Sequence, residues 1–285
     1  MGIVANGMLG LTLAHRFASP TAPARRQERH SRAAQAGAEP QRRQVNSIGT
    51  EWRAFFDDLQ DASPLYREQA ALYLRSLRAS VPLRHDQRVL DFGCGFAFVE
   101  ALLAPLVGHV CLWDPSPTMR TASKRQTADL PNVSFCDLST VAPGSGAPDE
   151  WRGRPFDLIL VNSVVQYMTP DELSAWLPRW RAMLTTAGAV VLSDLIPPDH
   201  RGQHDVVDLL RLGVRHGSTL RGVREALGGV TRYWRTSRAA PLQRVGSEDL
   251  ARRAAAAGLT VTALPANLTH FRRRWAALLR PQSSG

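Results

Sequence analysis

The stretch that decides the fold is residues 88–97, which read Arg-Val-Leu-Asp-Phe-Gly-Cys-Gly-Phe-Ala. Its first five residues form a short apolar run typical of a buried strand, and the glycines after it favour a tight turn into a helix. Glycine lets a ligand approach the backbone, and the helix N-terminus beyond offers unpaired N–H groups. The stretch therefore predicts a ligand site at a strand–turn–helix junction.

Two kinds of ligand fit such a turn. Dinucleotide folds place Gly-x-Gly-x-x-Gly against a pyrophosphate, but here Phe98 occupies the third glycine position and would crowd the helix–strand contact. Asp91, directly before the turn, would repel a pyrophosphate and suits an ammonium group. A zwitterionic amino-acid group fits both features, and pyrophosphate stays the weaker alternative.

Short apolar runs alternate with amphipathic stretches around this turn. We expect further strands at 109–113, 133–136, 156–161, 189–195, 259–264 and 271–279. We expect helices at 51–59, 64–77, 97–107, 117–128, 170–184, 205–214, 220–227 and 247–257. Gly188 is expected to close the helix over 170–184, and Ser247 to be the N-cap of the last helix. The pattern predicts an α/β fold, with a doubly wound, mostly parallel seven-stranded sheet and helices on both faces.

The domain organisation follows from composition. Residues 1–48 are expected to be a disordered or targeting-like tail, and residues 49–285 one domain. Within that domain the strand–helix rhythm breaks after Pro197 and Pro198, so residues 199–245 are expected to form a helical cap insertion over the substrate site.

The net charge of +10 is unevenly distributed along the chain. Residues 1–50 carry +5, residues 51–200 carry −5 and residues 201–285 carry +10. This distribution argues against a uniformly basic protein that coats nucleic acid. Hydrophobic content of 44% and charged content of 21% argue against disorder along the whole chain.

Neither a membrane span nor a structural metal is predicted. The sequence has no run of 18 apolar residues, and Cys94, Cys111 and Cys136 show no Cys-x-x-Cys spacing. A disulfide framework and a zinc site are therefore not expected. We expect a cytoplasmic location.

Polar residues also end the later strands. Asp114 lies 23 residues after Asp91, where a carboxylate can accept hydrogen bonds from both ribose hydroxyls. Asp137 follows the third strand and could accept a bond from an adenine amine, and Asn162-Ser163 ends the fourth. Because parallel strands bind ligands at their carboxyl ends, the set indicates an adenosine ligand.

At these residues the chain resembles the class I S-adenosylmethionine-dependent methyltransferases. The resemblance covers roughly residues 85–195 and 247–281 and rests on Val89–Ala97, Leu112–Met119, Cys136–Leu138, Phe156–Tyr167 and Leu184–Leu195. It departs at Ala97, where many members have a third glycine, and we interpret the alanine as a mild change.

The resemblance implies S-adenosylmethionine as cofactor, and a role for each matching residue. Asp91 and the turn of Gly93, Cys94 and Gly95 would hold its methionine part. Asp114, with Pro115 beside it, would hold the ribose. Asp137 and Leu138 would hold the adenine, while Asn162 and Ser163 would line the site near the methyl group.

The acceptor side is less defined. Tyr167, Tyr233 and Trp234 are candidate substrate-binding residues, and His200, His204 or His270 is the candidate base that an oxygen acceptor would need. His200 and His204 lie four residues apart, but no further metal ligand is identifiable, so no metal is expected.

We expect a small-molecule methyl acceptor, with an anionic one suggested by the positive charge of residues 201–285. RNA or protein methylation through that basic region, and a non-catalytic cofactor-binding module, are the alternatives. The sequence does not identify the acceptor or the acceptor atom.

Overall fold

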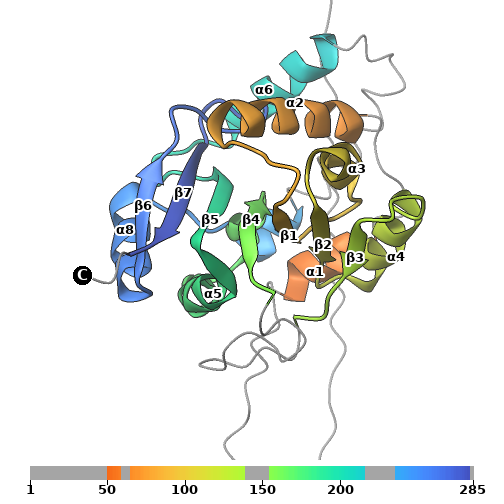
Figure 1. The fold of residues 1–285 in the computed structure, drawn as a ribbon. Coiled ribbons are helices and arrows are strands. Elements are labelled where there is room, and N and C mark those ends of the chain that lie inside the picture. Colours follow the sequence, from red (N-terminus) through yellow and green to blue (C-terminus); the bar gives the residue numbers. More distant parts are fainter. Residues whose placement is uncertain (1–49, 59–64, 139–153, 216–234, 283–285) are drawn as a thin grey trace, which may run out of the picture. The chain divides into compact units, whose positions relative to one another are not determined.

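The computed structural model describes residues 50–58, 65–138, 154–215 and 235–282 (Figure 1). The predicted tail over 1–48 lies outside these residues, as do the helix expected at 220–227, Tyr233 and Trp234. The described residues from Thr50 onward belong to one compact unit.

The centre of this unit is a seven-stranded sheet in the order β3-β2-β1-β4-β5-β7-β6. Its strands are β1 Arg88–Phe92, β2 His109–Trp113, β3 Val133–Phe135, β4 Phe156–Asn162, β5 Leu184–Leu195, β6 Leu259–Ala263 and β7 Trp275–Pro281. The first five pair in parallel, and β7 runs antiparallel to both β5 and β6. The predicted mostly parallel, seven-stranded sheet is confirmed.

Apolar side chains fill both faces of the sheet. Its helices are α1 Thr50–Asp57, α2 Leu65–Ser80, α3 Phe98–Leu103, α4 Pro117–Gln126, α5 Pro170–Met183, α6 Gln203–Arg215 and α8 Ser247–Ala256. Val89 of β1 packs with Leu77 of α2, while Leu90 packs with the α5 residue Trp180 on the other face. Figure 1 shows α2 and α3 on one side of the sheet and α5 on the other. This two-sided burial explains the nearly continuous apolar strands.

Helix α5 ends earlier than the sequence suggested. Thr169 caps it with a capping box, in which Thr169 Oγ1 accepts from the backbone N–H of Glu172 at 3.2 Å. The chain enters β5 at Leu184, directly after the helix. The prediction that Gly188 closes the helix is therefore wrong. Gly188 lies inside β5, where a Cβ atom would lie 2.9 Å from the carbonyl oxygen of Phe156.

Two boundaries near the C-terminus also differ from expectation. The N-cap of α8 is Gly246, and Ser247 is the first helical residue, so the predicted cap is shifted by one position. The last strand starts at Trp275 instead of residue 271. Residues 271–274 turn instead, since the Arg274 N–H donates to the carbonyl of Phe271, and the Arg272 N–H donates to the side chain of Asp208.

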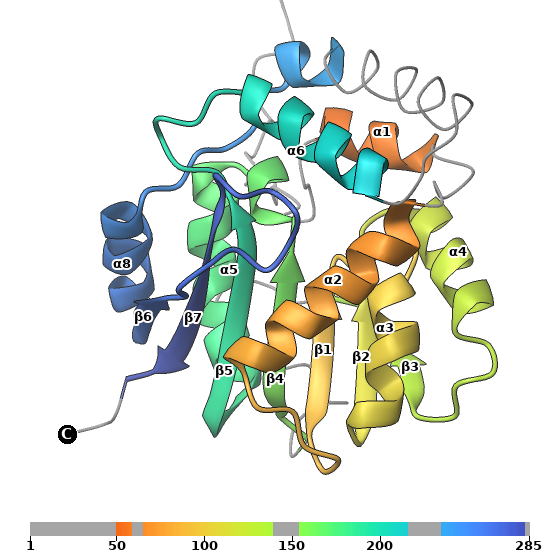
Figure 2. The same cartoon turned by 90° about the horizontal axis from the view of Figure 1, so that it is seen from above.

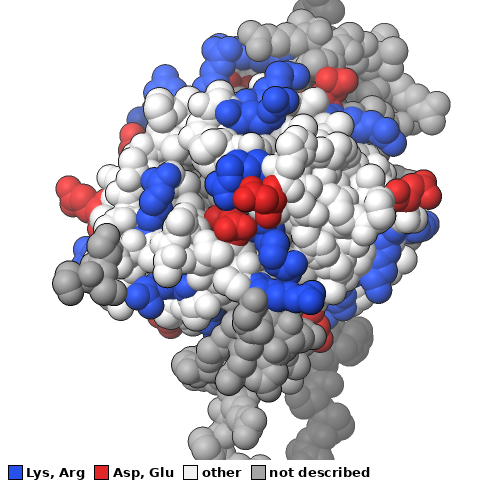
Figure 3. Space-filling view, viewed as in Figure 1, with Lys and Arg blue, Asp and Glu red and all other residues white. Residues whose placement is uncertain are grey.

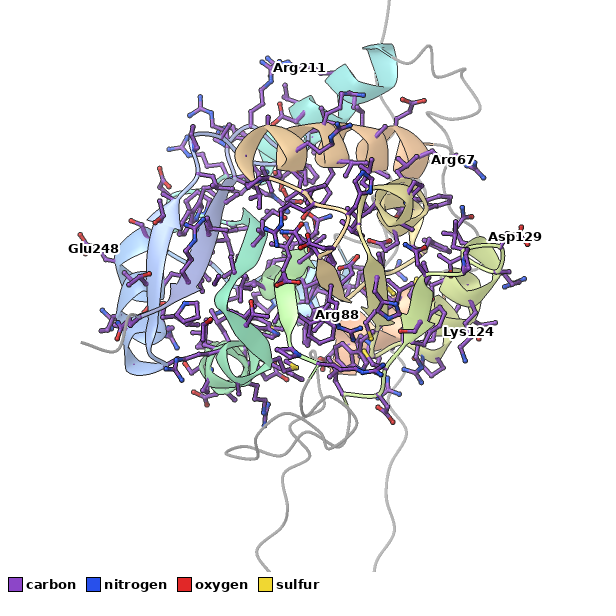
Figure 4. The ribbon with its side chains drawn as sticks, in the orientation of Figure 1. Arg67, Arg88, Lys124, Asp129, Arg211 and Glu248 are labelled. Atoms are coloured by element: carbon purple, nitrogen blue, oxygen red, sulfur yellow. The ribbon has the colours of Figure 1, made fainter. Side chains whose placement is uncertain are left out.

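Helices α1 and α6 lie beyond the carboxyl ends of the parallel strands (Figure 2). Trp52 of α1 donates from Nε1 to the carbonyl of Ala240 at 3.1 Å. Charged side chains at the periphery face solvent: Figure 4 shows Lys124, Asp129 and Glu248 directed outward, and all three are exposed. None of the helices in the described ranges has the length and apolar character needed to span a bilayer.

Candidate functional site

The turn after β1 is built on left-handed backbone. Gly93 has φ of 87° and Gly95 has φ of 54°. The N–H groups of Gly93 and Cys94 donate to the carbonyl of Trp113 at 2.7 and 3.1 Å, which ties the turn to β2. A Cβ atom on Gly93 would lie 2.5 Å from Cγ2 of Val164, whereas a Cβ atom on Gly95 would meet no atom within 4 Å. Gly93 is therefore required for packing, and Gly95 borders open space.

The backbone is strained at Ala97, where many members of the family have a glycine. Ala97, the N-cap of α3, has φ of 57° and ψ of 36°. A left-handed conformation costs an alanine roughly 1–2 kcal/mol, so replacing glycine here has a conformational cost that the sequence does not show. Ser163 and Asp194, at the ends of β4 and β5, are the other non-glycine residues with positive φ in the described ranges. Strain of this kind concentrates at functional sites.

Asp114 lies beside the turn, at the end of β2. Its Oδ2 accepts from the Gly95 N–H and its Oδ1 from the Ser116 N–H, both at 2.9 Å. Burial raises the pKa of Asp114 to about 6, against the lowering effect of these two hydrogen bonds. The N-cap of α4 is Ser116, whose Oγ accepts from the Met119 N–H. Asp114 is therefore not the helix cap, and its carboxylate lies next to the open space at Gly95.

Asp91 faces a second buried carboxyl group, that of Glu100, which none of the sequence motifs includes. Asp91 and Glu100 are 6% and 1% exposed, and Asp91 Oδ1 and both carboxyl oxygens of Glu100 have no hydrogen-bond donor in the described structure. Burial raises the pKa of both groups. For Glu100 the rise is larger, because the charge of Asp91 adds to it. The sequence signal was the spacing of Glu100 and Leu103, which lie on one buried face of α3.

Cys94 is a buried residue of the glycine turn. Burial raises the pKa of its thiol well above the usual value, so the side chain is a neutral packed group. What Cys94 offers to the turn is its backbone N–H bond to Trp113. Pro115 follows Asp114, and its carbonyl accepts from Nη1 of Arg120 at 3.0 Å.

The two residues predicted at the adenine position have different environments. Asp137 follows β3 at the same edge of the sheet and is exposed. Leu138 is completely buried in the core that contains Phe92 and Trp113. The structure thus gives Leu138 a packing role, and leaves Asp137 as the accessible polar group of this pair.

The ends of β4 and β5 are joined by side-chain hydrogen bonds. Asn162 Oδ1 accepts from Ser193 Oγ at 2.7 Å, and Ser163 Oγ donates to Asp194 Oδ2 at 2.6 Å. Asp194 also accepts from Asn267 Nδ2 at 2.6 Å. Ser193, Asp194 and Asn267 carried no distinctive sequence motif, because their partners are distant in the chain.

The candidate bases have distinct surroundings. His200 is 7% exposed, and its Nε2 lies 3.1 Å from Oδ1 of Asp205. The rings of His200 and His204 are 5.7 Å apart. Neither ring nitrogen of His270 has a hydrogen-bond partner in the described structure. Burial lowers the pKa of His270 although the charge of Asp194 opposes this, so the ring is neutral at pH 7. No group of three or more His, Cys, Asp or Glu side chains in the described ranges is arranged to hold a metal ion.

Tyr167 is partly buried beneath α1. Its ring centroid lies 4.7 Å from that of Trp52 and 5.2 Å from that of Phe56. The first helix of the domain, to which the sequence assigned no role, therefore covers this substrate-binding candidate. The other two candidates, Tyr233 and Trp234, lie outside the described residues.

The arginines near the C-terminus do not act as one surface group. Arg274 is 4% exposed, and its guanidinium contacts Asp205 at 2.8 Å and Asp194 at 3.7 Å. Arg272 and Arg273 are exposed. On the face shown in Figure 3, basic side chains form separate groups among uncharged surface.

Comparison with known proteins agrees with this geometry. Residues 90–190, from β1 to β5, match the family model described as a methyltransferase domain. Over this stretch the chain is similar to S-adenosylmethionine-dependent methyltransferases. The match covers the glycine turn, Asp114 and the end of β4, and it stops within β5.

Curated methyltransferases are similar over part of their length. The protein-L-isoaspartate O-methyltransferase of Erwinia tasmaniensis is 32% identical over 119 residues, which are 40% of this chain and 51% of that protein. The trans-aconitate 2-methyltransferase of Variovorax paradoxus is 30% identical over 138 residues, 48% of each chain. This chain thus covers about half the length of the curated relatives that it matches.

A solved complex shares the fold. The DhpI-SAM-HEP complex aligns with a TM-score of 0.52 at 17% identity, and the alignment covers 84% of this chain and 99% of that one. Similarity at this level of identity concerns the arrangement of strands and helices only.

The residues at the carboxyl edge fit the family's cofactor. A cofactor with an adenosine and an amino-acid group needs space at the glycine turn, a carboxylate for the ribose and a carboxylate for the ammonium. Gly95 borders the space, Asp114 lies beside it, and Asp91 keeps a buried oxygen without a donor.

Proposed function

We propose that this methyltransferase transfers the methyl group of S-adenosylmethionine to a small-molecule acceptor bound at the carboxyl edge of the sheet. The observation that carries the proposal is that this edge is covered. Helices α1 and α6 lie beyond the strand ends (Figure 2). In this proposal residues 199–245 form the cap over the acceptor. An RNA or a folded protein would need an open face.

The cap segment is attached to the strand ends by backbone hydrogen bonds. The Gln243 N–H donates to the carbonyl of Gln166 at 2.9 Å, and the Val245 N–H donates to the carbonyl of Ile196 at 2.8 Å. Gln166 precedes the substrate-binding candidate Tyr167, and Ile196 directly follows β5. These bonds support a cap held close to the acceptor side of the site.

The cofactor would lie along the carboxyl ends of β1, β2 and β4. In this proposal the carboxylate of Asp91 binds the ammonium group, and the backbone at Gly95 faces the ligand. Asp114 accepts hydrogen bonds from both ribose hydroxyls. Asp137 would receive the adenine amine, and Asn162 would lie near the methyl group. The polar partner of Asn162, Ser193, would hold its amide in place.

The bound cofactor would supply a methyl group on a positively charged sulfur, and this sulfur is a good leaving group. The protein's residues then have to align the acceptor and keep water out. For a hydroxyl acceptor we assign the base role to His270, because its ring is neutral and its nitrogens have no partner in the described structure. The ring would accept the hydroxyl proton as the oxygen attacks the methyl carbon.

Extract labelling tests the proposal. The full chain is incubated with a cell extract and methyl-labelled S-adenosylmethionine, and the label is separated into small-molecule, RNA and protein fractions. We expect label in the small-molecule fraction. Label confined to RNA or protein would replace the proposed acceptor class, and cofactor binding without label in any fraction would indicate a non-catalytic binding module.

A further inference from the structure

Three buried polar side chains from different elements lie close enough to interact electrostatically. Tyr73 comes from α2, Asp91 from β1 and Glu100 from α3, and they are 2%, 6% and 1% exposed. The hydroxyl of Tyr73, one carboxyl oxygen of Asp91 and both of Glu100 are buried and have no hydrogen-bond partner in the described structure. Buried polar groups are normally paired, so this cluster needs an explanation.

A shared proton explains the two carboxyl groups. Two ionised carboxylates cannot donate to each other, but a protonated carboxyl group donates to an ionised one. Burial, the charge of Asp91 and a hydrogen bond to Asp91 together raise the pKa of Glu100 well above its usual range. The same hydrogen bond lowers the pKa of Asp91, against the larger effect of its burial. Glu100 is the more deeply buried of the two, and neither of its carboxyl oxygens has a donor, so we assign the proton to Glu100 and the negative charge to Asp91.

The position of the pair decides which carboxyl group meets a ligand. Asp91 lies at the carboxyl end of β1, one residue before the end of the strand and directly before the glycine turn. Glu100 lies deeper, on the buried face of α3 together with Leu103. An ammonium group that enters at the turn would reach Asp91 first.

We propose that Glu100 is a positioning residue, whose protonated carboxyl group donates a hydrogen bond to Asp91 and keeps it as the single carboxylate that receives the ammonium group of the cofactor. This inference rests on the proposed function, because it needs the cofactor's amino-acid group to lie at Asp91. It adds a residue that no strand-end motif includes.

The test compares two ligands that differ in the amino-acid group. S-adenosylhomocysteine and 5′-methylthioadenosine both carry adenosine on a neutral sulfur, but only the first has the ammonium. The ratio of their affinities, measured by calorimetry on the full chain between about pH 5 and pH 8, cancels the loss of the ribose contact at Asp114, which both ligands would make. Because the charge of Asp114 also acts on Asp91, the same ratio is measured in D114N to separate the two titrations. The remaining groups that face the pair are Tyr73 from α2 and Cys94 from the turn, and burial raises the pKa of each.

In the unmodified chain the ratio should fall as the pH is lowered, because Asp91 takes up a proton and loses its charge. E100L removes the donor, so the pKa of Asp91 rises and the fall should move to higher pH by about one unit. E100Q keeps an N–H donor that cannot ionise, and its curve should match that of the unmodified chain.

Three outcomes would overturn the inference. The fall could keep its position in E100L, which would give Glu100 no influence on Asp91. E100Q could lose about tenfold in the ratio at pH 7, which would make Glu100 itself the charged partner. This second result also decides the matter if E100L does not fold. If neither ligand binds the unmodified chain, the proposed function fails as well, whereas binding of both with unchanged curves removes only the inference.

Discussion

Arg274 allows a quantitative prediction, because it is a buried charge with two carboxylate partners. Its side chain is 2% exposed and contacts Asp205 at 2.8 Å and Asp194 at 3.7 Å. Replacement by methionine keeps much of the volume and removes the charge. Breaking a buried pair by removing one partner costs about 3–5 kcal/mol.

The hydrogen-bond partners that the two carboxylates keep decide where in this range the cost of R274M lies. Asp194 keeps Ser163 and Asn267 as donors, and Asp205 keeps the contact with His200. Neither carboxylate is left entirely without a partner, so we expect R274M to lower the free energy of unfolding by about 3 kcal/mol. For a domain of this size that corresponds to a drop in Tm of about 6–12 °C.

The assay is urea unfolding followed by tryptophan fluorescence, with R273M as the matched control. Arg273 is adjacent and exposed, so R273M should change the free energy of unfolding by less than about 0.5 kcal/mol. Adding D205N to R274M should restore about 1 kcal/mol or more, because the orphaned charge is gone. Equal losses in R273M and R274M would refute the argument that Arg274 neutralises buried acids.

Three further predictions concern the site. G95A should lower the free energy of unfolding by about 1 kcal/mol, because alanine is strained in the left-handed backbone at this position, and it should weaken S-adenosylmethionine binding tenfold or more. G93A should destabilise the fold more strongly, because its methyl group would overlap a neighbouring side chain. Equal losses of stability in the two variants would contradict this prediction. D114N should weaken cofactor binding by about tenfold, as measured by titration calorimetry. In the unmodified chain the cofactor should bind above pH 6, and its affinity should be lost as the pH falls through the raised pKa of Asp114. H270N should lower kcat for a hydroxyl acceptor by about 10²-fold or more without changing cofactor affinity, and kcat of the unmodified chain should fall once the pH drops below the lowered pKa of His270. A kcat that stays unchanged in H270N would remove the base role.

The features that the sequence predicted correctly are local ones. The apolar run ending at Phe92, the glycines after it and the spacing to Asp114 are carried by neighbouring residues, and backbone sterics translate them directly into strand, turn and helix. The same local signals predicted the positions of the parallel strands. They failed at Gly188, where pairing with β4 extends β5 and overrides the glycine as a helix stop.

The charge pattern along the chain did not predict which basic side chains are exposed. The excess of +10 in residues 201–285 favoured an anionic acceptor or an RNA surface. In the structure Arg274 is buried among acids, and a residue count cannot show which charges reach solvent. Exposure depends on which elements pack together, and that is a property of the tertiary structure.

The sequence by itself indicated the family resemblance, the edge of the sheet expected to carry the site and the candidate residues Asp91 and Asp114. Only the tertiary structure decided that Glu100 faces Asp91, and that Trp52 covers Tyr167. The physical reason is the range of the interactions. A turn and a strand form from contacts between near neighbours, whereas a shared proton between carboxyl groups and the packing of α1 over the strand ends depend on groups that only folding brings together.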